Sequence, residues 1–291
     1  MTLQTIGRRR RPGTRTIAWR AVAYVALIAM SATILLPLGW MLTTALKPDF
    51  APVFTPTPQW FPTTDWEWNN FARALLDPAR PFWRYTLNTV FIVTMNIVGT
   101  VLSCSLVGYA FARLRFRGRE TLFAILIITM LIPWQALLIP QFLLFYNLGW
   151  YGTMLPLIVP SFFGNAFFIF LIRQYIRSIP VELELAARID GCNQWQVFRH
   201  IVLPLIRPVL MVCAVFVFLD SWNDLLGPLV YLIRDEDFTV AIGIANMVTS
   251  REPHLNLLMA ANLIMMIPAT LLYFLAQKQL VGGIASVGLK G

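Results

Sequence analysis

Long apolar runs separated by short polar blocks dominate this chain. A membrane-spanning helix needs ~20 mostly apolar residues, because each residue adds ~1.5 Å across a ~30 Å hydrocarbon core. Six stretches reach that length, at about 18–46, 85–112, 122–146, 154–176, 208–233 and 257–280. The pattern therefore predicts an all-α, polytopic membrane protein with six transmembrane helices.

Composition supports a membrane environment. Apolar residues make up 58% of the 291 residues and charged residues 13%, which is about half the charged share of an ordinary soluble domain. A soluble fold of this length has too little core volume to bury so much apolar surface. The net charge of +9 is spread in short blocks between apolar runs. This distribution fits membrane topology better than a nucleic-acid-binding face, so no nucleic-acid partner is expected.

Basic residues give the expected orientation. Most of the 23 precede the first span, separate spans two and three, surround the link between spans four and five, or follow the sixth span. The positive-inside rule then predicts that both termini are cytoplasmic, with a basic N-terminus at 1–17 and one transmembrane domain at 18–291. A cleaved signal peptide is the alternative, but the first apolar run exceeds the ~7–15 residues of a signal core.

The link at 179–207 reads as two short helices around a turn. Pro180 suits a first helical turn, and Glu182 and Glu184 favour the positive end of a helix. Gly191 suits the left-handed position that follows a helix, and Asn193 can cap a second helix. We therefore expect a structured cytoplasmic segment here.

Four further residues complete this segment. Pro204 and Pro208 are predicted to end the second short helix and to open the fifth span. Ala186 and Ala187 form a small-residue surface, which another protein could approach closely. The segment thus has the features of a docking loop.

The same segment resembles the EAA loop of ABC-importer permeases. In that pattern a glutamate, two alanines and an Asp-Gly pair precede Ile-x-Leu-Pro and a further proline; the matches are Glu182, Ala186, Ala187, Asp190, Gly191, Ile201, Leu203, Pro204 and Pro208. The resemblance implies a type I ABC importer permease fold, whose loop docks as a coupling helix into a cleft on a cytoplasmic ATPase. The implied coupling residues are Glu182, Glu184, Leu185, Ala186, Ala187, Asp190 and Gly191.

Leu185 departs from the family pattern. It stands where the family has a glutamate directly before the two alanines, which puts in doubt any salt bridge made from that position. Glu184 is the candidate substitute. However, a shift of one residue turns a helical side chain by about 100°.

The resemblance extends to the end of the chain. The segment 222–232 looks like the fifth-span signature of carbohydrate importers of the maltose type, and the tail ending in Lys290 and Gly291 is similar to their terminal pattern. This implies the permease subunit of an ATP-driven sugar importer in a bacterial or archaeal plasma membrane. The implied partners are a second homologous permease, two ATP-binding subunits and an extracytoplasmic solute-binding protein. Because the chain has no phosphate-binding loop motif, we expect no cofactor on it, with ATP and Mg bound by the ATPase subunits, and no enzymatic activity of its own.

Polar residues inside the predicted spans are candidates for the translocation path. Charged side chains at membrane depth are costly and usually face the protein interior. Asp220 and Asp224 are four apart and share a helix face, Asn223 is adjacent, and Trp222 supplies an aromatic surface. Further candidates are Asn96 and Asn165. The alternatives are helix-end or partner-subunit contacts for the aspartates and interhelical hydrogen bonds for the asparagines.

Other chemistries find little support in the sequence. The three cysteines have neither a disulfide framework nor metal-ligand spacing, so no metal site is expected. A permease for glycerol-phosphate or another polar solute is the nearest alternative, although no basic residue lies well inside a span. An intramembrane enzyme would need more convergent titratable groups than Asp220 and Asp224. A secondary transporter would not explain the docking loop.

Overall fold

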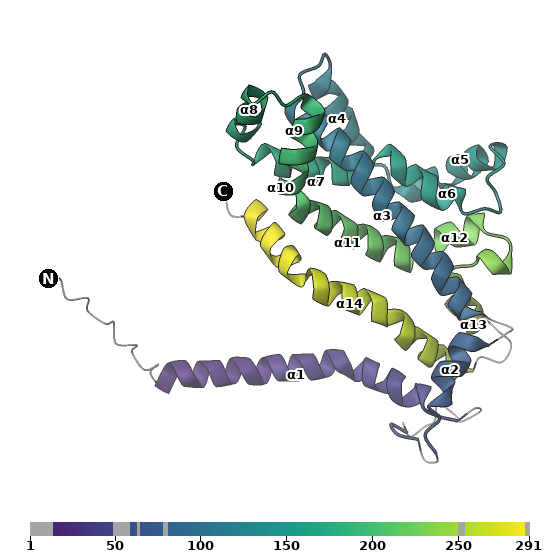
Figure 1. The fold of residues 1–291 in the computed structure, drawn as a ribbon. Coiled ribbons are helices and arrows are strands. Elements are labelled where there is room, and N and C mark those ends of the chain that lie inside the picture. Colours follow the sequence, from purple (N-terminus) through teal and green to yellow (C-terminus); the bar gives the residue numbers. More distant parts are fainter. Residues whose placement is uncertain (1–13, 49–58, 63–64, 78–80, 250–253, 289–291) are drawn as a thin grey trace.

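The structure, a computed structural model, describes residues 14–48, 59–62, 65–77, 81–249 and 254–288. Within these ranges the regular secondary structure is helical, with no strand (Figure 1). The predicted all-α fold is therefore confirmed. Most of the basic N-terminus and the terminal Lys290 and Gly291 lie outside the described residues.

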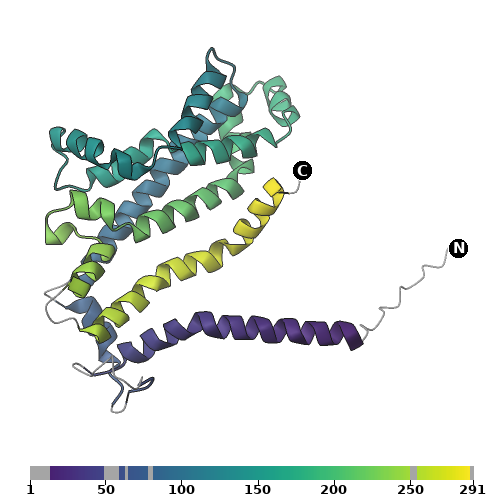
Figure 2. The same cartoon turned by 180° about the vertical axis from the view of Figure 1, so that it is seen from behind.

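Four long helices set the frame. They are α1 (Thr14–Ala45), α3 (Phe82–Arg113), α11 (Arg207–Asn223) and α14 (Leu255–Gly288). α3 packs against α11, which in turn packs against α14. α1 stands apart along most of its length, and its end meets α14 beside the short helix α2 (Asn69–Leu76) (Figures 1 and 2).

The predicted span at 122–146 is broken in the structure. It consists of α4 (Arg119–Thr129) and α5 (Trp134–Asn147), which meet at 99°. Pro133 explains the break, because proline has no N–H to donate and disfavours helical geometry in the residue before it. Whether this bent pair crosses the membrane as one span stays a prediction.

The predicted span at 154–176 is an interrupted helix. α6 (Leu155–Ile158) and a 3₁₀ turn, η1 (Val159–Phe163), precede α7 (Ala166–Arg177). The interruption falls at Gly164, whose φ of +90° lies in the region that L side chains avoid. η1 packs against α3.

The link at 179–207, predicted to be cytoplasmic, folds into short helices, as the sequence predicts. α8 (Glu182–Ile189) and α9 (Gln194–Val197) are followed by a π-helical turn, η2 (Phe198–Val202), and by α10 (Leu203–Leu205). The helix over Gln194–Leu205 then meets α11 at 72°.

The predicted span at 208–233 is also interrupted. α11 ends at Asn223, and α12 (Leu226–Tyr231) is a separate short helix. A 3₁₀ turn, η3 (Asp235–Asp237), then leads into α13 (Val240–Thr249). By length and composition, four helices of the described chain could cross a membrane, or up to six if each bent pair counts as one span.

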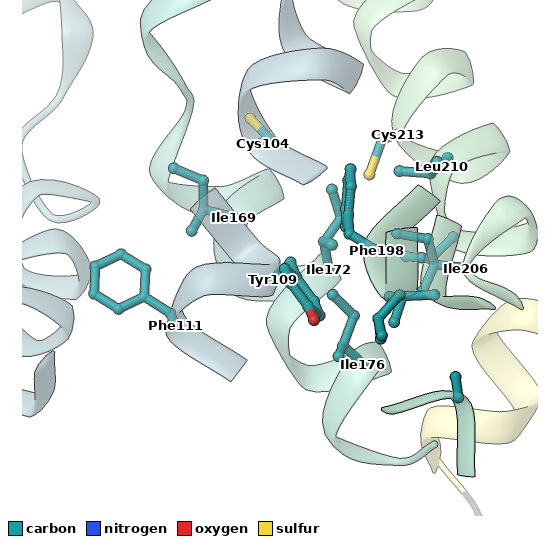
Figure 3. Packing of buried hydrophobic residues seen from close by; sticks show 14 residues of the cluster. Cys104, Tyr109, Phe111, Ile169, Ile172, Ile176, Phe198, Ile206, Leu210 and Cys213 are labelled. Carbon is teal, nitrogen blue, oxygen red and sulfur yellow. The ribbon is translucent and has the colours of Figure 1, made fainter. Parts of the chain in front are cut away.

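Two clusters of buried hydrophobic residues lie toward opposite ends of α3. The first gathers around Cys104, Tyr109, Ile172, Phe198 and Cys213, and it joins α3 to α7, η2 and α11 (Figure 3). The second joins the start of α3 to the end of α1, α2, α13 and α14. Each end of α3 is thus anchored in its own core.

Lys47, directly after α1, helps to fix α1 to α14. Its backbone carbonyl accepts hydrogen bonds from Asn70 Nδ2 at 2.8 Å and from Asn256 Nδ2 at 3.2 Å. Its ammonium donates to the backbone oxygen of Gln59 at 2.8 Å and lies over the Trp40 ring. Burial lowers the pKa of this ammonium group below its ordinary value.

Candidate coupling surface and polar cavity

α8 and α9 form around the turn that the sequence predicts. α8 carries Glu182 and Glu184 in its first turn and is followed by Gly191, whose φ is +88°. Asn193 caps α9: its side chain accepts from Gln196 N at 2.9 Å, while its own N–H donates to Gln196 Oε1 at 2.8 Å. This reciprocal capping box defines the start of α9.

The π-helical turn after α9 is a feature that the sequence analysis did not predict. Leu203 N–H donates to Phe198 O, five residues back. Pro204 follows at once and has no N–H of its own, so an ordinary helical ladder could not continue through it. The wider turn leads from α9 through α10 toward α11.

Arg113, at the end of α3, binds α8 to the membrane helices. Its Nε forms a buried ion pair with Glu184 Oε1, the two side chains being 12% and 2% exposed. Its Nη2 donates to the carbonyls of Ile176 at 2.9 Å and of Ile179 at 2.6 Å. Carbonyls at a helix end lack internal partners, so one guanidinium joins the ends of α3 and α7 to the start of α8.

Tyr109 makes a second connection, one helical turn before Arg113 on the same face of α3. Its hydroxyl accepts from Gln194 Nε2 at the start of α9. Gln194 Oε1 in turn accepts from Arg188 Nη2 at 2.9 Å. α8 and α9 are therefore each tied by a polar contact to α3.

Large apolar side chains are exposed on this segment, beside charged ones. Leu185 is 49%, Ile189 86% and Trp195 58% exposed. Of the predicted coupling residues, the structure also leaves exposed Glu182, Ala186, Asp190 and Gly191. We call the exposed residues Leu185, Ala186 and Ile189 of α8, together with Trp195 of α9, the α8 face.

Glu184 and Ala187 lie on the opposite side of α8. Glu184 is 1% and Ala187 7% exposed, so neither side chain reaches the α8 face. The physical reason is helical geometry: one step from Leu185 to Glu184 turns the side chain by about 100°, toward Arg113. Glu184 therefore does not replace the family glutamate on the outer surface.

Beside the first half of α3, three predicted path residues come together. Asp220, Asp224 and Asn96 line one cavity of about 220 Å³ between α3, α11, α12 and the α5–α6 region. Asn96 Nδ2 donates to Ser221 Oγ at 3.1 Å. Asp224 Oδ1 accepts from Gly227 N at 3.1 Å and so holds the first turn of α12. We call this space the polar cavity.

The other three predicted path residues lie elsewhere. Trp222 is buried, stacks on Phe218 and donates to Met265 O at 3.2 Å. Asn223 lies with Trp222 on a second cavity, of about 360 Å³, between α11, α13 and α14. Asn165 caps α7 by accepting from the backbone N–H groups of its first turn. The predicted constellation is thus divided among three places.

Nothing in the described part of the chain suggests a metal centre. No group of three or more His, Cys, Asp or Glu side chains gathers there to hold an ion. Cys104, Cys192 and Cys213 are free thiols.

Sequence reasoning missed four residues that matter at these sites. Tyr109 and Arg113 carried a readable signal, because they are four apart at the cytoplasmic end of a predicted span. Tyr231 and Thr239 line the polar cavity, but no periodicity connects two residues that meet through the turn between α12 and α13.

Comparisons with known proteins agree with this geometry. The family described as "Binding-protein-dependent transport system inner membrane component" matches residues 104–285, more than half of the chain. The arabinooligosaccharide transport permease of Halalkalibacterium halodurans is 35% identical over 72% of this chain and 75% of that protein. The lactose transport permease of Rhizobium radiobacter is 31% identical over the same shares of the two chains.

Wider comparisons cover nearly the whole chain. The diacetylchitobiose uptake permease of Streptomyces coelicolor is 28% identical over 95% of this chain and 99% of that protein. Among solved structures, a chain of a bacterial ABC transporter that imports the acidic polysaccharide alginate has a TM-score of 0.79 at 23% identity, covering 92% of this chain and 99% of that one. The likeness to this solved structure shows the fold of the chain.

Family membership fixes the general role. Proteins of this family are the non-catalytic, multi-pass inner-membrane subunits of ABC transporters, which work with ATPase and substrate-binding partners. The chain belongs to the family of inner membrane components of binding-protein-dependent transport systems, as a permease subunit of an ABC importer.

Proposed function

We propose that this chain forms a sugar translocation pathway with a second, homologous permease and that its α8 face docks on one of two ATP-binding subunits. The α8 face is the observation that carries the coupling role. Its large side chains are exposed on α8 and α9, which Arg113 and Tyr109 respectively hold to the membrane domain. Because Leu185 replaces the family glutamate, we expect this docking contact to be mainly apolar, with little sensitivity to salt.

α3 is the element that transmits closure of the ATPase. Its 32 residues make a helix of about 48 Å at ~1.5 Å per residue. α1, α5 and α14 each contain an internal proline, at Pro37, Pro140 and Pro268, whereas α3 contains none. A helix without proline resists kinking, so displacement of α8 at the end of α3 moves the polar cavity beside Thr89, Ile92 and Asn96 in its first half.

A sugar is the substrate class that the relatives and the cavities favour. The relatives named above carry arabinooligosaccharides, lactose and diacetylchitobiose. Among the described residues, no Lys, Arg or His lines either the polar cavity or the 360 Å³ cavity. Phosphate recognition normally uses such cations, so glycerol-phosphate is the weaker candidate.

The remaining parts of the proposal concern partners and orientation. A solute-binding protein delivers the sugar at the outer face, and ATP and Mg stay on the ATPase subunits. Both chain termini face the cytoplasm, as do α8 and α9. The basic residues that flank the predicted cytoplasmic segments support this orientation.

Reconstitution tests the proposed function. The chain, its partner permease, the ATPase subunits and the solute-binding protein are placed together in proteoliposomes with ATP inside. Uptake of radiolabelled lactose, arabinobiose and diacetylchitobiose is then measured, with glycerol-phosphate as the competing candidate.

We expect ATP-dependent uptake of at least one neutral sugar and none of glycerol-phosphate. Omission of the ATPase should abolish uptake, which serves as the control for passive leak. Uptake of glycerol-phosphate alone, or failure of the ATPase to co-purify with the chain in mild detergent, would contradict the proposal.

A further inference from the structure

The polar cavity contains an unusual concentration of unpartnered polar atoms. Among the described residues, four buried side-chain oxygens have no hydrogen-bond partner: Asn96 Oδ1, Tyr231 Oη, Thr239 Oγ1 and Thr44 Oγ1. The first three line the polar cavity. Buried polar atoms are nearly always paired, so three unpartnered oxygens around one cavity indicate that the cavity binds a polar ligand.

These oxygens are well buried and come from separate elements. Tyr231 and Thr239 are 5% and 4% exposed. Tyr231 ends α12, Thr239 directly precedes α13, and Asn96 lies on α3. Neighbouring backbone groups on α12 and α13 are held in place: Gly227 N donates to Asp224 Oδ1 at 3.1 Å, and Val240 N donates to Thr89 Oγ1 at 3.0 Å.

The charge of the cavity lining determines which ligands the cavity favours. Asp220 is exposed at the rim and Asp224 is partly buried, and no basic residue lines the space among those described. Two carboxyl groups repel an anion and accept hydrogen bonds from hydroxyl donors. An acidic or phosphorylated ring is therefore disfavoured.

The rest of the lining is apolar. Ile92, Trp134, Pro156, Leu157 and Pro228 supply carbon surface beside the oxygen atoms. A sugar ring has the matching character, since its C–H faces pack on apolar and aromatic groups while its hydroxyls both donate and accept. A metal ion would use only acceptors, and the described residues offer no group of three acidic, His or Cys ligands.

The cavity volume sets the size of the ligand. About 220 Å³ is several times the ~30 Å³ that a water molecule occupies in the liquid. It is also below the ~300–1,000 Å³ of pockets for drug-sized ligands. The space thus suits one ring and excludes a whole oligosaccharide.

We propose that the polar cavity is a subsite for a single neutral sugar ring, formed entirely within this subunit, with Tyr231 and Thr239 as its hydrogen-bonding residues. It rests on the proposed function, since it assigns a place in this chain to one ring of the transported solute. It goes further in requiring no residue of the second permease and in rejecting acidic rings.

Saturation-transfer NMR on the assembled complex in nanodiscs tests this subsite. The probes are arabinose, galactose and N-acetylglucosamine as neutral rings and glucuronate as the acidic ring. The test variant is Tyr231→Phe/Thr239→Val, which removes two hydroxyls and preserves shape. The matched control is Thr44→Val, which removes the fourth unpartnered oxygen, in the last turn of α1 and outside the cavity lining. Gel filtration with the ATPase verifies that each variant assembles.

We expect at least one neutral ring to bind the wild-type complex and to bind the double variant about tenfold more weakly, because two hydrogen bonds are lost. Thr44→Val should bind as the wild type does, and glucuronate should give no signal. If the double variant fails to assemble, the two single variants are measured instead, with about threefold weakening expected from each.

Three results would overturn the subsite. They are unchanged affinity in the variants, binding of glucuronate as strong as that of the neutral rings, and no binding of any neutral ring. Proteoliposome uptake separates these from failure of the proposed function. A complex that imports a neutral sugar with the same KM in wild type and double variant keeps its function and loses the subsite.

Discussion

Two sites on α3, its C-terminal end at Arg113 and its middle at Asn96, are built on opposite principles. At Arg113 the polar groups are satisfied: the guanidinium meets Glu184 and two carbonyls, and Tyr109 accepts from Gln194. At Asn96, about 26 Å away at ~1.5 Å per residue, the neighbouring polar atoms lack partners around a cavity. The first site is a closed joint, whereas the second is prepared for a ligand.

This difference matches two functions, the transmission of force and the binding of a solute. A joint that transmits force gains from buried, fully paired polar contacts, because breaking any one leaves an unpaired group in a low-dielectric environment. A site that binds and releases a solute gains from polar groups whose partners are supplied by that solute. The predictions below test whether the two sites respond to mutation with opposite signs.

The largest expected effect is at the joint. Arg113→Met should lower the stability of the subunit by about 3–5 kcal/mol, because it leaves the Glu184 carboxylate buried without its partner. Uptake should fall more than tenfold. Thermal unfolding of the solubilised complex and proteoliposome uptake measure these effects. Arg115→Met is the matched control, since Arg115 is exposed, and its effect should stay within about 0.5 kcal/mol.

The double variant Arg113→Met/Glu184→Leu sharpens the same test. Removing both charges should recover most of the lost stability, because no buried carboxylate then remains unpaired. Equal destabilisation by the single and double variants would show that Arg113 acts through its contacts with Ile176 and Ile179 alone.

An intermediate loss of stability is expected from a substitution at Gly99, which lies between Asn96 and Arg113 on α3. A Cβ on Gly99 would overlap Ser161 Oγ and lie 2.7 Å from the Phe162 ring. Gly99→Val should therefore force η1 away from α3 and cost about 1–3 kcal/mol. Gly39→Val on α1 meets nothing within 4 Å and is the control. Thermal unfolding measures both, and similar values for the two variants would contradict close packing at Gly99.

The smallest expected effects on stability, at Tyr109 and Tyr231, are opposite in sign to each other. Tyr109→Phe removes a satisfied hydroxyl and should lower stability by about 0.5–1.5 kcal/mol. Tyr231→Phe removes an unpartnered hydroxyl and should raise the stability of the sugar-free complex by up to about 1 kcal/mol. Denaturation in the absence of sugar measures both changes. A loss of similar size in both variants would remove the distinction between the two sites.

Much of the coupling segment could be predicted because its signals are local. Gly191 and Asn193 specify a helix end and a helix start through contacts within a few residues, whereas Pro180 lies two residues before α8 begins. The same local rules did not predict the π-helical turn before Pro204 or the 99° bend between α4 and α5. In both places a proline interrupts the regular helical ladder, but the proline alone does not specify the geometry in which the chain continues.

The polar cavity could be predicted only in part. The spacing of Asp220 and Asp224 placed them on one face, and that inference needed only helical periodicity. The division between Asp224 and Asn223 depends on where α11 ends, and the contribution of Tyr231 and Thr239 depends on how α12 folds back. Such contacts between distant elements leave no pattern in a single sequence.

The docking of the α8 face on the ATPase is the central claim, and one affinity measurement tests it most directly. Ile189 is 86% exposed, so Ile189→Asp should leave the fold intact and place a charge in the contact; Ile189→Leu is the conservative control. We predict that Ile189→Asp weakens ATPase binding at least tenfold with an unchanged thermal midpoint, and that Ile189→Leu binds normally. Wild-type affinity in Ile189→Asp would contradict the account.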